Sequence, residues 1–517
     1  MLIKTFGYAV FGISATKVTV EVNINEGINF FMVGLPDNAI KESHKRIDAA
    51  LKNNGFKIPG KCITVNMAPA DLKKEGSAYD LTIAIGILAA SQKIPSDRLN
   101  SLLIMGELSL DGELRPIKGA LPISIKAKED GFKGIILPAS NAEEASVVEG
   151  LDVYPATHLK EVIDFLNGLF EIQKPESWSE SALRQNKSSN NLAEYTFDFS
   201  EVKGQETIKR ALEIAAAGGH NVLLIGPPGA GKTMISKRLP SILPPLSKDE
   251  ALETTKIHSV AGKLGKNFGL VSTRPFRSPH HTISDVALVG GGVNPQPGEI
   301  SLAHNGVLFL DELPEFKRTV LEVMRQPLED RVVHISRAKF SIEYPASFML
   351  VASMNPCPCG YFNHPEKDCV CAPGIVQKYL SKISGPLLDR IDLHVEVTPV
   401  SFKELRETKS TESSSEIRQR VIRAREIQKQ RFATSSNQHC NAQMGNKEIQ
   451  SHCKLNGAGE QLLKNAMEKL GLSARAYDRI LKVARTIADL ENSKAIETNH
   501  IAEAIQYRSL DREAWAV

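Results

Sequence analysis

Three short apolar runs stand out in the middle of the chain, at residues 222–225, 307–310 and 348–353. Continuous apolar runs of this length are typical of strands that are buried on both faces, as in a parallel sheet covered by helices. Each run leads to glycine or to polar residues, which we expect at the carboxyl edge of such a sheet. The pattern therefore predicts an α/β core in this region.

The flanking regions follow other patterns. Residues 18–22 alternate between apolar and polar side chains, and residues 37–54 have the period of a helix, so the N-terminal region is predicted to be α+β. Residues 171–191 are polar, rich in serine and almost without aliphatic side chains, which is typical of a linker. The predicted organisation is an N-terminal domain at residues 1–170, a linker at 171–195, the α/β core at 196–402 and a C-terminal helical domain at 403–517.

Length and composition are those of a soluble globular protein. The 517 residues are 42% hydrophobic and 24% charged, which allows about three domains. The net charge of +3 is small, so any contact with nucleic acid must depend on a local patch or a pore. The longest apolar stretch, residues 81–90, is too short to span a bilayer, and the N-terminus lacks the features of a signal peptide. We therefore expect a cytoplasmic protein without a membrane partner.

The first apolar run leads into the sequence GPPGAGKT, which fills every fixed position of the phosphate-binding loop motif. The loop consists of Gly226, Pro227, Pro228, Gly229, Ala230, Gly231, Lys232 and Thr233. Its glycines allow backbone N–H groups to close around phosphate oxygens, and the helix expected after it directs its positive end to the same charge. Lys232 is expected to reach the β and γ phosphates of ATP and Thr233 to bind Mg²⁺, whereas the alternative is an ordinary glycine-rich turn.

The other two runs lead to polar side chains that suit nucleotide hydrolysis. Asp311 and Glu312 follow the second run. Asp311 suits the coordination shell of Mg²⁺, and Glu312 is placed to orient or activate the attacking water, although a surface acidic pair is the alternative. Asn355 follows the third run and could hold that water near the γ phosphate. Together the three strands predict an α/β core that binds and hydrolyses a nucleotide.

Four further segments are not required by any general ATPase motif. They are RPFRSPHHTIS at residues 274–284, ALVGGGVNPQPGEISLA at 287–303, NPCPCG at 355–360 and SGPLLDRID at 384–392. With them the chain resembles, from end to end, the magnesium-chelatase-like AAA+ proteins known as the YifB or ComM family. The resemblance implies an AAA+ P-loop NTPase core with a helical lid, ATP and Mg²⁺ as cofactors, and a homo-oligomeric ring. The ring is expected to be a hexamer in which a neighbour completes each active site.

The resemblance also implies roles for two arginines. Arg390 would be the arginine finger that acts on the neighbouring subunit's nucleotide, and Arg475 would be the sensor 2 arginine of the lid. A guanidinium suits such roles because it stabilises the charge that spreads over the transferred phosphoryl oxygens. For Arg390 the alternative is an ion pair within its own chain, with Asp389 or Asp392. Two other arginines on the same predicted helix could replace Arg475, namely Arg479 and Arg485.

Residues 106–140 resemble the catalytic domain of Lon protease and the C-terminal domain of the RadA recombination protein. This resemblance implies the ribosomal protein S5 domain 2-like α+β fold for the N-terminal domain. Lon uses a serine with a lysine as its base. The corresponding positions hold Ala78 and Leu121 here, and Ser77, one residue away, has no evident base. We therefore expect a domain retained for assembly or binding rather than a peptidase.

Four of the seven cysteines lie close together in the core, as two CxC pairs separated by nine residues. They are Cys357, Cys359, Cys369 and Cys371. Four thiolates in a cytoplasmic protein suit a tetrahedral Zn²⁺ better than disulfides. The spacing is tighter than that of the usual zinc knuckle, and free or redox-sensitive thiols are the alternative. The other cysteines are Cys62, Cys440 and Cys453, which we expect to be buried free thiols.

Three histidines near these motifs could also be metal ligands. His364 lies between the two cysteine pairs and is either a replacement ligand or a solvated loop residue. His280 and His281 are adjacent, and two neighbours rarely hold one ion without further ligands. We therefore expect His280 and His281 to line the pore or a contact between subunits.

Two inserts are candidates for contact with a substrate. Residues 331–344 alternate apolar and basic side chains across a predicted hairpin, which in related helicases projects into the ring channel. Arg337 and Lys339 at its tip could contact DNA phosphates, and an ordinary solvated turn is the alternative. The glycine-rich residues 289–298 resemble an insert that moves with the nucleotide state.

Three functions are compatible with such a ring. The first is a DNA translocase or helicase that promotes branch migration in recombination during natural transformation, with single-stranded or branched DNA as its partner. The hairpin and the RadA-like domain favour it. The second is a chelatase-type motor that remodels a protein partner or aids metal insertion into a tetrapyrrole, although the chain shows no integrin-like metal-binding domain. The third, a Lon-like protease or its regulator, is disfavoured by the missing serine and lysine.

Overall fold

The computed structural model describes residues 2–175, 197–265, 269–292, 295–337, 340–362, 364, 366–400, 412–433 and 438–508. The described residues form two compact units. The first unit comes from residues 2–175 and 248–271, and the second comes from residues 197–247 and 272–508. Most of the predicted linker, from residue 176 onward, lies outside the described residues.

The first unit has the predicted α+β architecture. Its larger sheet has the strand order β1-β2-β4-β3. The strands are β1 (Leu2–Phe11), β2 (Ser14–Asn25), β3 (Phe30–Val33) and β4 (Cys62–Ala68). Two helices belong to this part, α1 (Asn38–Asn53) and α2 (Asp80–Ala90). Because α2 packs against β1, β2 and α1, all of its residues are buried, which explains why its sequence is apolar on every side.

A smaller parallel sheet of order β5-β8-β9 completes the first unit. Its strands are β5 (Leu102–Ile104), β8 (Gly134–Pro138) and β9 (Asp152–Ala156), and the short strands β6 (Glu107–Leu108) and β7 (Leu114–Arg115) pair with each other. The accompanying helices are α3 (Ala120–Glu129), α4 (Ala142–Ser146) and α5 (Leu159–Leu166).

One helix of the first unit comes from a distant part of the sequence. Helix α9 (Lys248–Val260) packs on α3, and the side chain of Glu144 joins the two. The Glu144 carboxylate accepts hydrogen bonds from Leu121 N at 2.7 Å and from the Ser259 hydroxyl. Burial raises the pKa of Glu144. In the sequence, residues 248–271 therefore interrupt the second unit and belong to the core of the first unit.

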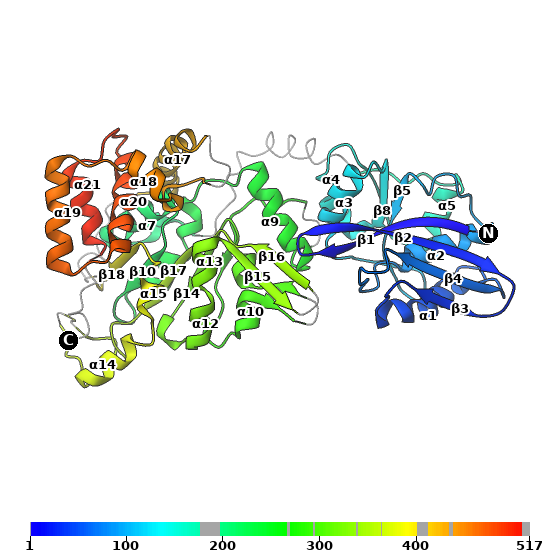
Figure 1. Ribbon diagram of the computed structural model, residues 1–517, viewed down its shortest axis with the longest axis horizontal. Helices are drawn as coiled ribbons and strands as arrows, with labels where there is room; N and C mark the ends of the chain where they lie inside the picture. The colour runs from blue at the N-terminus through cyan, green and yellow to red at the C-terminus, as the bar shows by residue number, and fades with distance from the viewer. Residues whose placement is uncertain are drawn as a thin grey trace. The chain divides into compact units, whose positions relative to one another are not determined.

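The second unit contains the predicted parallel sheet. Its strand order is β11-β14-β17-β10-β18, and every neighbouring pair is parallel. The strands are β10 (Val222–Ile225), β11 (Phe276–Arg277), β14 (Val307–Leu310), β17 (Met349–Met354) and β18 (Leu393–Glu396). Figure 1 labels the four longer ones side by side. The three apolar runs are thus the three central strands, and their residues are buried on both faces.

Shorter elements surround this sheet. The helices are α7 (Glu206–Gly218), α8 (Lys232–Ser236), α10 (Asp285–Val289), α11 (Glu299–Leu302), α12 (Arg318–Val323), α13 (Arg325–Asp330), α14 (Pro373–Leu380) and α15 (Gly385–Leu388). A hairpin joins β15 (Val332–Arg337) to β16 (Phe340–Pro345), as predicted, and β12 (Gly290–Gly291) pairs with β13 (Gln296–Pro297) within the glycine-rich insert.

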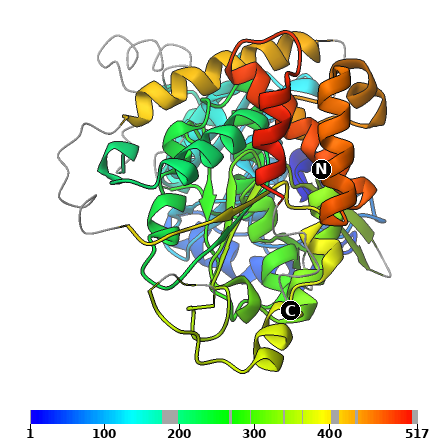
Figure 2. The same cartoon turned by 90° about the vertical axis from the view of Figure 1, so that its left-hand side faces the viewer.

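The C-terminal region is helical, as predicted. Its helices are α17 (Ser414–Arg431), α18 (Asn446–His452), α19 (Gly457–Leu470), α20 (Ala474–Leu490) and α21 (Thr498–Gln506). Figure 2 shows them grouped together, mostly in orange and red. Helices α17 and α20 pack on α7, so the helical region shares one hydrophobic core with the sheet. Among the described residues, no helix is long and apolar enough to cross a membrane.

Candidate nucleotide-hydrolysis site

The parallel sheet brings three distant parts of the chain to one edge. Leu310 at the end of β14 pairs with Ala352 of β17, and Ile225 at the end of β10 pairs with Met354. The residues that follow these strands therefore meet at the carboxyl edge, where α/β proteins bind ligands. They are the phosphate loop, the Asp311–Glu312 pair and Asn355.

The phosphate loop has the geometry that its glycines predict. Gly229 and Gly231 have positive φ values of 78° and 83°, a conformation that glycine adopts without strain. A Cβ added at Gly226 would lie 2.3 Å from the carbonyl oxygen of Val397, so that position also excludes larger residues. The glycines therefore allow the tight backbone turns by which N–H groups can face phosphate oxygens.

Lys232 lies inside the loop and is largely buried. Its ammonium donates to Gly226 O at 2.6 Å, to Pro227 O at 2.9 Å and to Asn355 Oδ1 at 3.0 Å. Burial lowers the pKa of Lys232, and the charges of Asp311 and Glu312 partly offset this effect. The ammonium and the Asn355 amide are thus next to each other, where both could contact a γ phosphate.

Asp311 is the centre of a second group of polar side chains. Its carboxylate accepts hydrogen bonds from Thr233 Oγ1 at 2.7 Å, from the Ser353 hydroxyl, and from Glu312 N at 3.1 Å. Carboxylate and hydroxyl oxygens are ligands that Mg²⁺ prefers. Thr233 and Asp311 are therefore close enough to share one magnesium ion, as the sequence motif predicts.

Glu312 has an unusual backbone. Its φ of 54° and ψ of 52° place it in the left-handed region, which a residue with a side chain rarely occupies. Such conformations persist where the surrounding structure requires them, and they are common at functional sites. The Glu312 side chain is 57% exposed, so its carboxylate is accessible to a water molecule.

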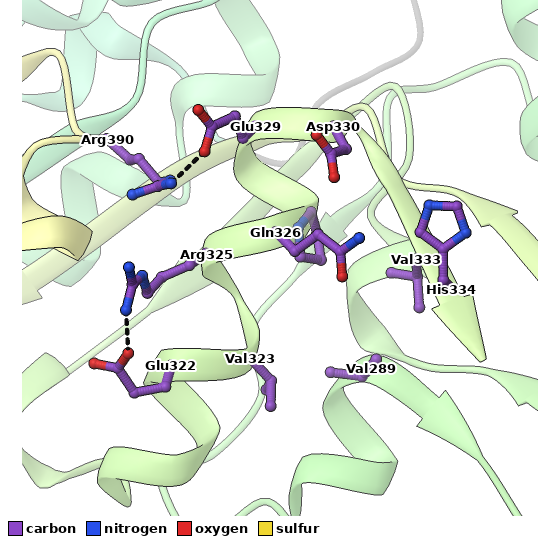
Figure 3. A pocket seen from close by; sticks show the side chains of 11 residues that line it. Val289, Glu322, Val323, Arg325, Gln326, Glu329, Asp330, Val333, His334 and Arg390 are labelled. Carbon is purple, nitrogen blue, oxygen red and sulfur yellow. Dashed lines mark hydrogen bonds and ion pairs between the residues drawn. The ribbon is translucent and has the colours of Figure 1, made fainter. Parts of the chain in front are cut away.

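Arg390 lies away from the nucleotide loop of its own chain. It donates to Pro386 O at 2.7 Å and forms an ion pair with Glu329, rather than with Asp389 or Asp392. Figure 3 shows this pair at the edge of a cavity of about 490 Å³, together with the ion pair of Arg325 and Glu322. No residue of the phosphate loop lines the cavity. A role for Arg390 would therefore require the nucleotide of another subunit.

The three arginines considered for the sensor 2 role differ in their surroundings. Arg475 is 60% exposed and lies 3.6 Å from Asp389. Arg479 pairs with the buried Asp392 at 2.8 Å. Arg485 is buried and donates to Asp489 and to two backbone carbonyls. Arg485 thus makes its contacts within the helical region, Arg479 joins that region to the sheet, and Arg475 is the most accessible of the three.

The four clustered cysteines come together as a group. Their sulfur atoms all lie within 4.8 Å of one another, and the distances from Cys369 to Cys357 and Cys359 are 3.7 and 3.6 Å. A tetrahedral zinc site with Zn–S bonds of about 2.3 Å has sulfur–sulfur edges of about 3.8 Å. None of these four cysteines is in a disulfide, and the arrangement of their sulfur atoms fits Zn²⁺. His364 lies outside the cluster, and its Nδ1 accepts from Glu366 N and Lys367 N.

The cysteine loop touches the phosphate loop. Gly360, which follows Cys359, has a φ of 85°, and a Cβ added there would lie 2.4 Å from Pro228 Cδ. Gly360 N also donates to Cys357 O at 3.0 Å. The conformation of the cysteine cluster therefore affects how closely this segment packs against the nucleotide loop.

The hairpin that was predicted to contact DNA has one buried and one exposed face. Val333, Ile335, Ile342 and Tyr344 are buried, and His334 pairs with Glu343 at 3.2 Å on the other face. The backbone of Arg337 ends β15, but its side chain and Lys339 lie outside the described residues. The predicted DNA contact is thus untested by the geometry.

The Lon-like positions in the first unit lack a serine and lysine pair. Leu121 is buried in α3. Ser77 donates its hydroxyl to Glu107, and the buried Lys74 donates to Gly34 O and Pro69 O. The described contacts of Ser77 and Lys74 are therefore with other groups.

Sequence reasoning missed two residues at the site. Ser353 was assigned only to a strand, yet its hydroxyl bonds Asp311. Gln205 donates to Ala230 O of the phosphate loop at 2.6 Å from a left-handed backbone with a φ of 58°. The position of Ser353 at a strand end facing Asp311 was a usable signal, whereas no motif pointed to Gln205.

A phosphate loop, an acidic pair and a polar strand end on a parallel five-stranded sheet, followed by a helical region, define a P-loop ATPase of the AAA+ type. Family models support this class. The magnesium chelatase subunit ChlI matches residues 198–405, a further ChlI model matches residues 20–141, and the ChlI C-terminal model matches residues 411–508.

Individual relatives narrow the assignment. The chain is 46% identical to the competence protein ComM of Haemophilus influenzae over 511 residues, which covers 98% of this chain and 97% of the relative. It is 45% identical to YifB of Escherichia coli, over 98% and 96% of the two chains. Lon protease 2 of Bacillus subtilis is 30% identical over 125 residues, 24% of this chain and 22% of the protease. The chain belongs to the ComM/YifB family of magnesium-chelatase-like AAA+ ATPases.

The roles expected for Lys232 and Glu312 predict that nucleotide binding and hydrolysis can be separated by mutation. We expect Lys232→Ala to lower the affinity for ATP about 100-fold, because a buried charged hydrogen-bond donor to phosphate is lost. Glu312→Gln should bind ATP normally and lose turnover by about 10² to 10⁴-fold, because only the water-activating carboxylate changes. Isothermal titration and a steady-state ATPase assay measure the two effects, with the exposed Lys237→Ala as control. Normal turnover by Glu312→Gln would contradict the assignment.

The cysteine cluster should hold about one Zn²⁺ per chain in protein purified without a histidine tag. Removing the metal with a chelator should loosen residues 357–371 and weaken ATP binding through the contact of Gly360 with Pro228. Elemental analysis and nucleotide titration check both effects, and Cys62→Ser is a control that should retain the metal. Substoichiometric zinc together with four freely titrating thiols would favour the free-thiol alternative.

Proposed function

We propose that this protein forms a hexameric ATP-driven ring that translocates on DNA and promotes branch migration during recombination in natural transformation. The observation that carries the proposal is the similarity, over nearly the full length of both chains, to a relative named as a competence protein. ATP and Mg²⁺ would bind between the phosphate loop and Asp311. Glu312 would activate water, and Asn355 would hold it near the γ phosphate.

The β15–β16 hairpin supports a substrate in the ring channel. Its buried face anchors it to the second unit, and Tyr344 donates to Pro295 O of the glycine-rich insert at 2.9 Å. A hairpin joined in this way to an insert that moves with nucleotide state would transmit that movement to its tip. Arg337 and Lys339 near the tip would contact phosphates without reading the base sequence.

The second candidate is a chelatase-type motor that acts on a protein partner or aids metal insertion. It is favoured by the three ChlI family models, which together match most of the chain. Both candidates use the same ATPase site in a ring. They differ in the substrate, which is DNA in the first and a protein partner in the second. Stimulation of ATP hydrolysis by DNA distinguishes them.

The arginine finger makes a prediction about assembly. Arg390→Ala should bind ATP normally and lose hydrolysis by about 10³-fold or more, because a finger stabilises only the transition state. Mixed into wild-type rings, it should also slow the unmodified subunits. Glu329→Gln breaks the same ion pair but keeps the guanidinium, so it should retain turnover. Equal losses in the two variants would show that Arg390 acts through the ion pair within its own chain.

The DNA contact makes a separate prediction. Changing Arg337 and Lys339 to alanine should leave basal ATPase intact but reduce its stimulation by DNA. The slope of log affinity against log salt should fall by about 1.4 to 1.8 for two lost phosphate contacts. The exposed Lys447 and Lys464 changed to alanine remove the same charge elsewhere and serve as control. A wild-type ring that no DNA form binds or stimulates, four-way junctions included, would move the protein-remodelling candidate ahead.

A further inference from the structure

The residues that follow β11 lie beside the carboxyl edge of the sheet, next to the residues that follow β14. Phe276 and Arg277 pair in parallel with Val307 and Leu308 of β14, so the residues after Arg277 and the residues after β14 emerge in the same direction. Arg277 is held by two hydrogen bonds to the Glu299 carboxylate, at 2.6 and 2.7 Å. The chain is therefore anchored at Arg277, three residues before His280 and four residues before His281.

One of these histidines faces Glu312. His281 Nδ1 lies 3.7 Å from Glu312 Oε2, close enough for an imidazole N–H to face the carboxylate. The His281 side chain is 33% exposed and that of Glu312 is 57% exposed. Neither His280 nor His281 belongs to a group of metal-ligating side chains in the described parts of the chain. Glu312 is the acidic side chain that His281 faces.

The imidazole of His281 is fixed from two sides. Its ring packs against that of His280, with 4.1 Å between the ring centres, and meets the edge of Phe316 at 6.4 Å. His280 is held in a turn, since its Nδ1 lies 2.9 Å from Thr282 Oγ1 and its carbonyl accepts from Ile283 N at 3.0 Å. The ring of His281 is therefore in contact on two sides, with His280 and with Phe316.

We propose that His281 is a positioning residue for Glu312. The inference rests on the proposed role of Glu312 in activating water. A glutamate side chain has several freely rotating bonds, so an unrestrained carboxylate samples many positions. The left-handed backbone sets the direction in which the side chain leaves the chain, and the imidazole limits where the carboxylate goes. Catalysis requires such groups to be held within about 0.5 Å of the productive geometry.

Three substitutions separate positioning from packing. His281→Phe keeps a ring against His280 and Phe316 but removes both nitrogens. His281→Asn places an amide donor near the position of Nδ1. His280→Phe keeps the stacking and leaves the contact with Glu312 intact. The measurements are kcat and KM for ATP hydrolysis, the affinity for ATP, and thermal unfolding as a check on folding.

We expect His281→Phe to lower kcat about tenfold or more, since small displacements of a catalytic group have effects of this size, with KM and ATP affinity unchanged. His281→Asn should recover part of the loss, and His280→Phe should behave like the unmodified protein. An unchanged kcat in His281→Phe, an equal loss in His280→Phe, or a rise in KM alone would overturn the inference. Normal turnover by Glu312→Gln would instead overturn the proposed role of Glu312 itself.

Discussion

The parallel pairing of β10, β14 and β17 is the constraint on which the whole site depends. Leu310 pairs with Ala352, so Asp311, the next residue, meets Ser353, and the hydroxyl of Ser353 bonds its carboxylate. A slip of one residue would move the strand ends by about 3.3 Å and turn Ser353 to the other face of the sheet. The register of these three strands therefore sets the distances between the polar groups of the site.

One buried carboxylate, that of Asp392, links the start of β10 and β18 to the helical region. Asp392 accepts from Asn221 N, just before β10, at 3.0 Å and from Arg479 of α20 at 2.8 Å. Burial opposes its ionisation, but Arg479 and His220 hold the pKa of Asp392 well below its usual range. Removing one partner of such a pair costs about 3 to 5 kcal/mol. Arg390 lies two residues before Asp392, and Arg475 lies one helical turn before Arg479. The Asp392–Arg479 ion pair therefore also fixes the positions of the two backbone segments that carry Arg390 and Arg475 relative to each other.

The elements that could be predicted from the sequence are those formed by one continuous stretch of residues. The three strands, the phosphate loop and the β15–β16 hairpin each follow from a local pattern whose physical reason is local burial or backbone geometry. The partners of these elements could not be predicted, because they depend on which distant segments become neighbours. Glu329 beside Arg390, Gln205 beside Ala230 and the packing of α9 on α3 are of this kind. The alternatives considered for Arg390 were its sequence neighbours, and the structure pairs it across 61 residues instead.

One residue of the nucleotide site, Asn355, lies in the same short segment as the cysteine cluster. Asn355, which accepts from Lys232, is two residues before Cys357, and Gly360 rests on Pro228 directly after Cys359. A segment held at both of these points has little freedom to shift one contact without the other. A zinc ion bound by the four thiolates would therefore stiffen the side of the site that carries Asn355, and its second pair of ligands, Cys369 and Cys371, would tie that side to the start of α14. The tight CxC spacing is consistent with this position, because each added residue would lengthen the connection between the metal cluster and the groups that it supports.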